Sequence, residues 1–87
     1  MREEIPDDTG ILFVFPEPQY HAFIMTDVFF PLSIAFIDAK GVIKEIKYME
    51  PMDASLTRSS HSVPYALEVA EGWFSQHGIA AGDRVEG

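Results

Sequence analysis

The most regular local pattern in this chain is an alternation of large and small residues that ends at a glycine, Leu32-Ser33-Ile34-Ala35-Phe36-Ile37-Asp38-Ala39-Lys40-Gly41. The alternation places Leu32, Ile34 and Phe36 on one face of a β-strand. Gly41 suits the left-handed backbone that a hairpin turn requires. Residues 42–48 alternate less regularly, so a returning antiparallel strand is expected there, with helical spacing as the alternative.

Two apolar segments precede this hairpin. Residues 10–15 form an aromatic and β-branched run closed by Pro16-Glu17-Pro18, a pattern typical of a buried strand that ends at a proline loop. Residues 20–30 are also rich in aromatics, but they are interrupted at Asp27 and end before Pro31. They predict a strand with a bend or bulge.

A strand and a short helix are predicted downstream. Residues 65–69 alternate like a strand, and residues 71–77 predict a helix that stops at Gly78. The alternative is one continuous helix over residues 65–77, which Gly72 would destabilise by about 1 kcal/mol.

The remaining segments complete the prediction of the fold. Residues 50–62 are polar and without periodicity, so a long irregular segment is expected, and residues 81–85 suggest a turn into a truncated last strand. Together the segments predict a mainly β fold, a small antiparallel sandwich or barrel-like double sheet with one short helix. At 87 residues and 47% hydrophobic content, the chain has room for one core, so residues 1–87 are expected to form a single domain.

Composition excludes several kinds of site and location. There is no cysteine, which excludes a disulfide framework and a thiolate metal site. The apolar runs are far shorter than the roughly 20 residues that a membrane-spanning helix needs. Residues 1–8 lack the positive start and apolar segment of a secretory signal, so the chain as written is expected to be cytoplasmic. An exported form is the alternative if a segment precedes these residues.

The charge of the chain argues against nucleic acid as a partner. The formal net charge is −8, and the six basic residues are scattered apart from Lys40, Lys44 and Lys47. Neutralising phosphates requires clustered lysine or arginine, so DNA or RNA binding is not expected.

Three histidines are candidates for chemistry at neutral pH, namely His21, His61 and His77. They do not share the short spacing of a metal-binding motif, and no metal site or cofactor is predicted. A hydrolase could pair Ser59 or Ser60 with His61, but neighbouring residues rarely align a nucleophile with its base. All three histidines are therefore interpreted first as structural or surface residues.

Two carboxylates interrupt apolar segments and are the more interesting candidates. Asp27 lies between Met25-Thr26 and an apolar triplet, and Glu68 lies inside the strand predicted over residues 65–69. A carboxylate in such a place must be hydrogen-bonded, ion-paired or exposed to solvent. Asp27 is interpreted as a bulge or exposed edge residue, and Glu68 as the partner of Arg84 or Arg2.

The order of the landmarks resembles a known family, the bacterial and archaeal domain-of-unknown-function family 192. The resemblance spans essentially the whole chain and rests on five motifs in order: Gly10-Ile11-Leu12-Phe13-Val14-Phe15, Phe23-Ile24-Met25, Pro31-Leu32-Ser33-Ile34-Ala35-Phe36-Ile37-Asp38 with Gly41, Leu67-Glu68 with Gly72, and His77-Gly78-Ile79 before Gly82-Asp83. It implies a compact, mainly β fold and no established activity.

The resemblance also implies differences from the family. The family pattern opens with further strands and a Gly-Leu-Met-x-Arg element, whose last part Met1-Arg2 is similar to, so the chain is expected to begin inside the domain. Thr26-Asp27-Val28 stands where the family has Lys-Asn-Thr, and Ser33 replaces the usual aspartate. If those polar residues form a site in the family, this chain has lost much of it.

Three functions follow as hypotheses. The first is a non-enzymatic binding or self-association module that forms a homodimer by pairing an exposed sheet edge. The second is a small-ligand-binding protein or hydrolase-type enzyme with Asp27, His21 and Glu68 around a pocket lined by three apolar residues, Phe23, Met25 and Phe36. The third is an acidic module that binds a basic protein.

Overall fold

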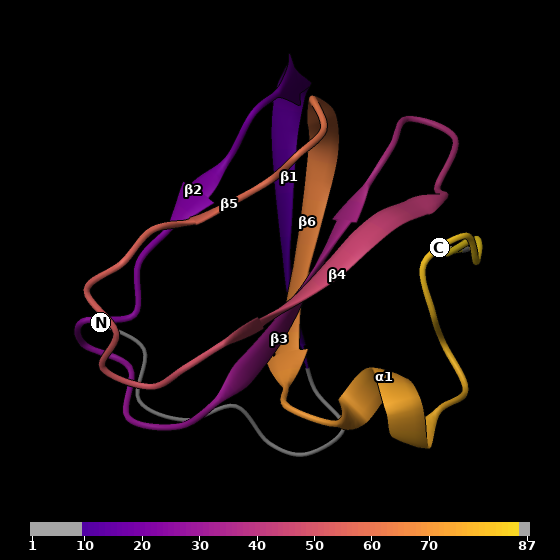
Figure 1. Ribbon diagram of the computed structural model, residues 1–87. Coiled ribbons are helices and arrows are strands. Elements are labelled where there is room, and N and C mark those ends of the chain that lie inside the picture. The colour runs from indigo at the N-terminus through magenta and orange to yellow at the C-terminus, as the bar shows by residue number, and fades with distance from the viewer. Residues whose placement is uncertain (1–9, 86–87) are drawn as a thin grey trace.

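The described part of the chain, residues 10–85 of a computed structural model, folds into two antiparallel sheets and one short helix (Figure 1). The larger sheet has four strands in the order β1-β6-β3-β4, and the smaller sheet pairs β2 with β5. The elements are β1 (Gly10–Gln19), β2 (Ala22–Phe23), β3 (Leu32–Ile37), β4 (Ile43–Met49), β5 (Thr57–Arg58), β6 (Val63–Ala70) and α1 (Trp73–Gln76). The mainly β fold predicted from the sequence is confirmed.

The central strand β3 is largely buried, because β4 and β6 flank it and a core cluster packs on each of its two faces. One face carries the first core cluster, in which Leu32, Ile34 and Phe36 pack beneath Met25 and Val28. The opposite face carries the second cluster, made by Ala35, Ile37, Ile43, Val69 and Phe74. The alternation predicted for residues 32–37 is therefore confirmed, although the small residue Ala35 is buried as well and Ser33 is half-buried.

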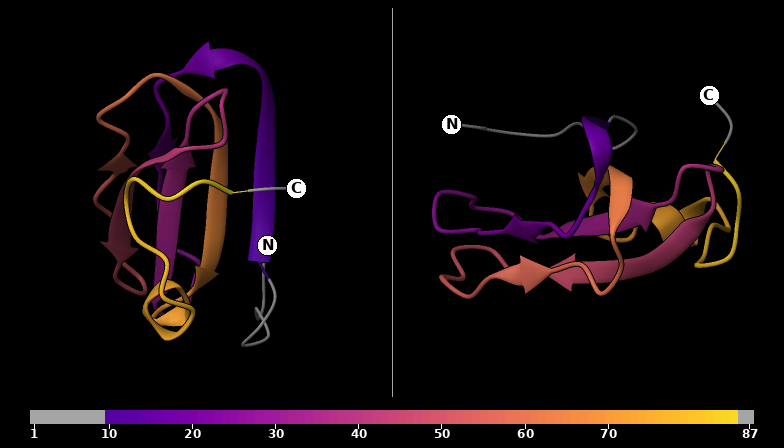
Figure 2. Two further views of the ribbon diagram at one scale, coloured as in Figure 1. Left: turned by 90° about the vertical axis from the view of Figure 1, so that its right-hand side faces the viewer. Right: turned by 90° about the horizontal axis from the view of Figure 1, so that it is seen from above.

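The two core clusters explain how the remaining elements are arranged. The small sheet of β2 and β5 lies on one side of the large sheet, while α1 and the C-terminal segment lie on the other (Figures 1 and 2). Phe74 anchors α1 in the second cluster.

His77 supports the end of helix α1, because its ring nitrogen Nδ1 donates a hydrogen bond to the carbonyl oxygen of Trp73 at 2.8 Å. Gly78 follows in the left-handed conformation at φ 66°, so the predicted helix stop is confirmed.

The predicted turn between β3 and β4 is also confirmed. Gly41 has φ 85°, and a Cβ built there would lie 2.7 Å from the backbone oxygen of Val85, so glycine is required for both conformation and space. The side chain of Asp38 closes the turn by accepting hydrogen bonds from the backbone N–H groups of Lys40 and Val42, each at 2.9 Å.

These hydrogen bonds predict a pH dependence of stability. The N–H of Val42 above all, then that of Lys40, and the charge of Lys44 lower the pKa of Asp38 from its ordinary value of 3.8. A carboxylate whose pKa is lower in the folded than in the unfolded state stabilises the fold above the unfolded pKa, and this contribution is lost as the pH falls through the folded pKa. We expect Asp38→Asn to be less stable than the wild type at pH 7 and the two free energies of unfolding to converge below pH 4, measured by urea denaturation at several pH values. Asp27→Asn, in an exposed turn, is the control. Between pH 7 and pH values below 4, its free energy of unfolding should change by the same amount as that of the wild type.

Three sequence predictions need correction. Residues 10–15 belong to an outer strand of the large sheet rather than a buried one, since Leu12 and Val14 are exposed, and β1 continues through the two prolines to Gln19. Over residues 20–30 only β2 is a strand, and a turn at Thr26-Asp27 and irregular loops account for the rest. The truncated strand expected at residues 81–85 is a single bridge between Val42 and Arg84.

Strand pairing decides between strand and helix in the two segments where the sequence allowed both. Residues 42–48 fall within strand β4 apart from the first of them, and helical spacing there is wrong. The continuous helix over residues 65–77 is also wrong, because residues 63–70 pair with both β1 and β3. The long irregular segment at residues 50–62 contains only the two-residue strand β5. The element at Met1-Arg2 lies outside the described residues.

Candidate functional site

His21 is a buried member of the aromatic core. Its ring stacks on Phe36 with centroids 6.1 Å apart and planes at 5°, and it lies 4.4 Å from the ring of Phe15. The ring nitrogen Nε2 lies 2.7 Å from the carbonyl oxygen of Val63. A carbonyl oxygen can only accept, so Nε2 carries the proton and donates it. This arrangement fixes the ring in place and leaves only Nδ1 as a potential base.

Ser59 holds the same histidine from the backbone side. Its Oγ accepts a hydrogen bond from the backbone N–H of His21 at 2.8 Å, and the N–H of Ser59 donates to the carbonyl oxygen of His21 at 3.0 Å. Ser59 is buried whereas His61 is exposed. The serine that the hydrolase hypothesis offered as a nucleophile is thus part of a structural bridge between β2 and β5.

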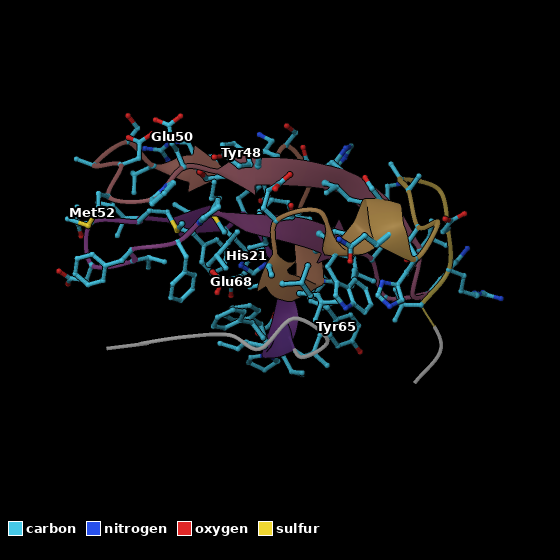
Figure 3. All side chains as sticks on the ribbon, turned by 90° about the horizontal axis from the view of Figure 1, so that it is seen from below. His21, Tyr48, Glu50, Met52, Tyr65 and Glu68 are labelled. Carbon is cyan, nitrogen blue, oxygen red and sulfur yellow. The ribbon has the colours of Figure 1, made fainter. Side chains whose placement is uncertain are left out.

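Glu68 is a carboxylate in the interior, with only 1% of its surface exposed. It is paired in register with Ile11 on β1 and Ile34 on β3, so it shares the face of the sheet that carries Phe36. Figure 3 shows His21 and Glu68 on this same face of the large sheet. The predicted partner Arg84 lies elsewhere, because its Nε donates to the carbonyl oxygen of Lys40 at 3.1 Å, and Arg2 is outside the described residues.

The remaining residues of the hypothetical ligand site do not join His21 and Glu68 around a pocket. Phe36 and Met25 are buried in the first core cluster, and Phe23 packs against it. Asp27 is exposed in the turn at residues 26–27, away from the interior that holds His21 and Glu68. The structure therefore brings five of the six predicted residues to one packed core and leaves Asp27 in solvent.

Two hollows lined by described residues lie elsewhere. One, of about 380 Å³, lies beside β1 and is lined by Leu12, Ile37, Ala39, Lys40, Gly41, Tyr65 and Val85. Another, of about 350 Å³, lies beside α1 and is lined by Ser33, Ile46, Glu71, Gly72, Phe74, Ser75, Ile79, Ala80 and Ala81. Neither includes any of the six predicted residues. Among residues 10–85 there is no group of three histidine, aspartate or glutamate side chains that could hold a metal ion, and no helix there is long and apolar enough to span a bilayer.

Exposed apolar side chains are the surface feature that sequence reasoning missed. Leu12 is 56% exposed and Val14 is 64% exposed on the outer strand β1. A second group projects from two loops at one end of the sheet and comprises Ile24, Phe29, Met52 and Leu56. In the sequence Leu12, Val14, Ile24 and Phe29 look like core residues, whereas Met52 and Leu56 lie in a polar segment. Only strand order and burial show that all six are exposed.

Comparison with known proteins agrees with the resemblance found in the sequence. The family model DUF192, described as an uncharacterized ACR, matches residues 1–87. The chain belongs to the DUF192 family. A search of the curated proteins finds none that matches this DUF192 domain.

Two solved structures share the fold of this DUF192 domain. A protein from Sinorhizobium meliloti described as a proposed transcription regulator is 32% identical with a TM-score of 0.91, and the match covers 99% of this chain and 67% of that one. A protein of unknown function from Novosphingobium aromaticivorans is 27% identical with a TM-score of 0.89, over 100% of this chain and 63% of that one. The chain thus spans about two thirds of the length of each.

Proposed function

We propose that this DUF192 domain is a non-enzymatic binding module that self-associates through the outer edge of β1. The observation that carries the proposal is the position of β1, which among residues 10–85 pairs with β6 on one side only. The unpaired N–H and C=O groups of an outer strand are a ready template for another strand.

The composition of β1 favours pairing along its first half. Residues 10–15 contain no charge and no proline, and Leu12 and Val14 offer exposed apolar side chains beside that edge. Pro16 and Pro18 lack N–H groups and limit pairing along the second half. An antiparallel pair formed by two copies of residues 10–15 would be symmetric, as a twofold dimer requires.

The charge of the chain sets the expected salt dependence. Two copies with a formal net charge of −8 each repel one another. Screening of that repulsion should strengthen self-association as salt is added, whereas binding of a basic partner would weaken. An edge of six residues is a small interface, so association in the micromolar range is expected.

Leu12→Lys tests the proposed edge. A lysine on an edge strand opposes pairing through its charge, and we expect the dimer to weaken at least about tenfold. The matched control is Tyr48→Lys on β4, the outer strand at the opposite side of the sheet, where Tyr48 is also exposed. Light scattering and sedimentation velocity over a concentration series give the dissociation constants, and circular dichroism verifies that both variants fold.

Two results would refute this proposal. One is a wild-type protein that stays monomeric at high micromolar concentration in high salt. The other is a dimer that weakens equally in both variants, because that would place the interface away from β1.

A further inference from the structure

The loops at one end of the large sheet form a joined surface. Residues 24–30 follow β2, and residues 50–56 follow β4. Two backbone hydrogen bonds tie these loops together, from the N–H of Met25 to the oxygen of Asp53 at 3.2 Å and from the N–H of Met52 to the oxygen of Val28 at 2.9 Å. The joined loops lie at the opposite end of β3 and β4 from the turn at Gly41 (Figure 1).

Four apolar side chains stand exposed on these two loops, and we call them the loop-end patch: Ile24, Phe29, Met52 and Leu56. Phe29 is 65% exposed and Met52 is 53% exposed, although Met25 and Val28, on the same loop as Phe29, are buried in the core. The first loop thus has an inner side that completes the core, and both loops carry exposed apolar side chains. Exposed apolar groups that gather in one place are typical of interaction sites.

Met52 is held in an unusual backbone conformation. It is the one residue other than glycine with positive φ among residues 10–85, at 61°. A methionine in the left-handed region is strained, and the hydrogen bond from its N–H to Val28 keeps it there. Figure 3 shows Met52 at one end of the molecule, with Glu50 also at that end.

Acidic side chains border the patch. Asp27 and Glu50 are exposed, and Asp53 is half-buried with its Oδ1 accepting from the N–H of Ser55. Three of the five cations among residues 10–85 lie at the opposite end, around the turn between β3 and β4. They are Lys40, Lys44 and Arg84, and the Nε of Arg84 donates a hydrogen bond to the backbone carbonyl oxygen of Lys40.

The other two described cations lie on β4 and β5, which belong to different sheets. Lys47 on β4 is engaged with the carboxylate of Glu45 at 3.7 Å and with the carbonyl oxygen of Arg58 at 2.6 Å, and Arg58 itself lies on β5. The acidic border at Asp27 and Glu50 therefore has no cation in its own loops, residues 24–30 and 50–56.

We propose that the loop-end patch binds a basic amphipathic segment of another protein. Apolar side chains of the partner would cover Phe29 and Met52, while its lysines or arginines would lie over Asp27 and Glu50. Such a segment matches both the apolar centre and the acidic border, whereas an acidic or purely polar segment matches neither.

A designed peptide provides the probe. It has about 18 residues, or roughly five helical turns, of leucine and lysine in amphipathic order, and carries a fluorescent label for anisotropy titration. A second peptide with the same leucines but glutamate in place of lysine is the control ligand. The first peptide should bind, more weakly as salt is added, and the second should not.

Matched variants locate the binding. Met52→Gly removes the side chain and suits the positive φ, so it should melt at the same or a higher temperature while binding the lysine peptide about tenfold more weakly. Tyr20→Ser, an exposed aromatic outside both loops, should bind like the wild type. The double variant Asp27→Asn/Glu50→Gln should bind the lysine peptide more weakly than the double variant Glu17→Gln/Glu71→Gln. The second variant makes the same change in net charge elsewhere on the exposed surface.

Three results would overturn the proposal. Equal losses of peptide affinity in the two double variants would mean that binding depends on net charge alone. Full binding by Met52→Gly would exclude the patch as the anchor. A shift of the monomer–dimer equilibrium in Met52→Gly, with peptide binding unchanged, would show that a second copy of this chain covers the patch instead.

Discussion

Replacement of Phe36 by alanine is expected to lower the free energy of unfolding by about 3–5 kcal/mol. Phe36 is completely buried on the central strand β3 and packs with the rings of His21 and Phe23 at 6.1 Å each. Truncation removes the apolar burial and leaves a cavity that a core flanked by β4 and β6 cannot close. Since domains are stable by only about 5–15 kcal/mol, this variant should be close to unfolding.

Urea denaturation followed by circular dichroism measures the effect of this change. Phe29→Ala is the matched control, because Phe29 is mostly exposed on a loop and should change stability by less than about 0.5 kcal/mol. Similar losses in both variants would mean that Phe36 is not the centre of the core.

His21→Ala is expected to lower the free energy of unfolding by about 2–4 kcal/mol, because it removes both ring contacts and a hydrogen bond. The variant loses the stacking on Phe36 and the tilted ring contact with Phe15, and it leaves the carbonyl oxygen of Val63 without the donor that now lies 2.7 Å away. His61→Ala changes an exposed residue and should have almost no effect on stability.

The two large effects should not add. Because the rings of His21 and Phe36 are stacked in one cluster, the double variant should lose less than the sum of the two single losses. Strictly additive losses in the free energy of unfolding, or a negligible loss in His21→Ala, would contradict the structural role of His21. Either result would favour a chemical role for this residue.

The candidate site shows how far residue types alone can lead. His21, Phe23, Met25, Phe36 and Glu68 do share one packed region, as the sequence hypothesis expected of a site. That region is the core of the protein, and it is filled by side chains. Sequence reasoning could not tell a pocket from a core, because both are built from aromatic residues with a few polar groups, and only packing distinguishes them.

The two proposed surfaces could not be found by residue type for the same reason. Leu12 and Phe29 stand in apolar runs that would be buried in many folds. Positive φ at Met52 has no signal in the sequence, since methionine rarely adopts it. Strand order exposes Leu12, and the turn that ties the two loops exposes Met52.

By itself the sequence determined the features that depend on neighbours along the chain. The alternation over residues 32–37, the turn at Gly41 and the helix stop at Gly78 were predictable because side-chain period and backbone freedom are local properties. Only the tertiary structure decided that β1 is an outer strand and that Glu68 is buried. The physical reason is that burial depends on which distant segments cover a face, and the same apolar run can be core or surface depending on that covering.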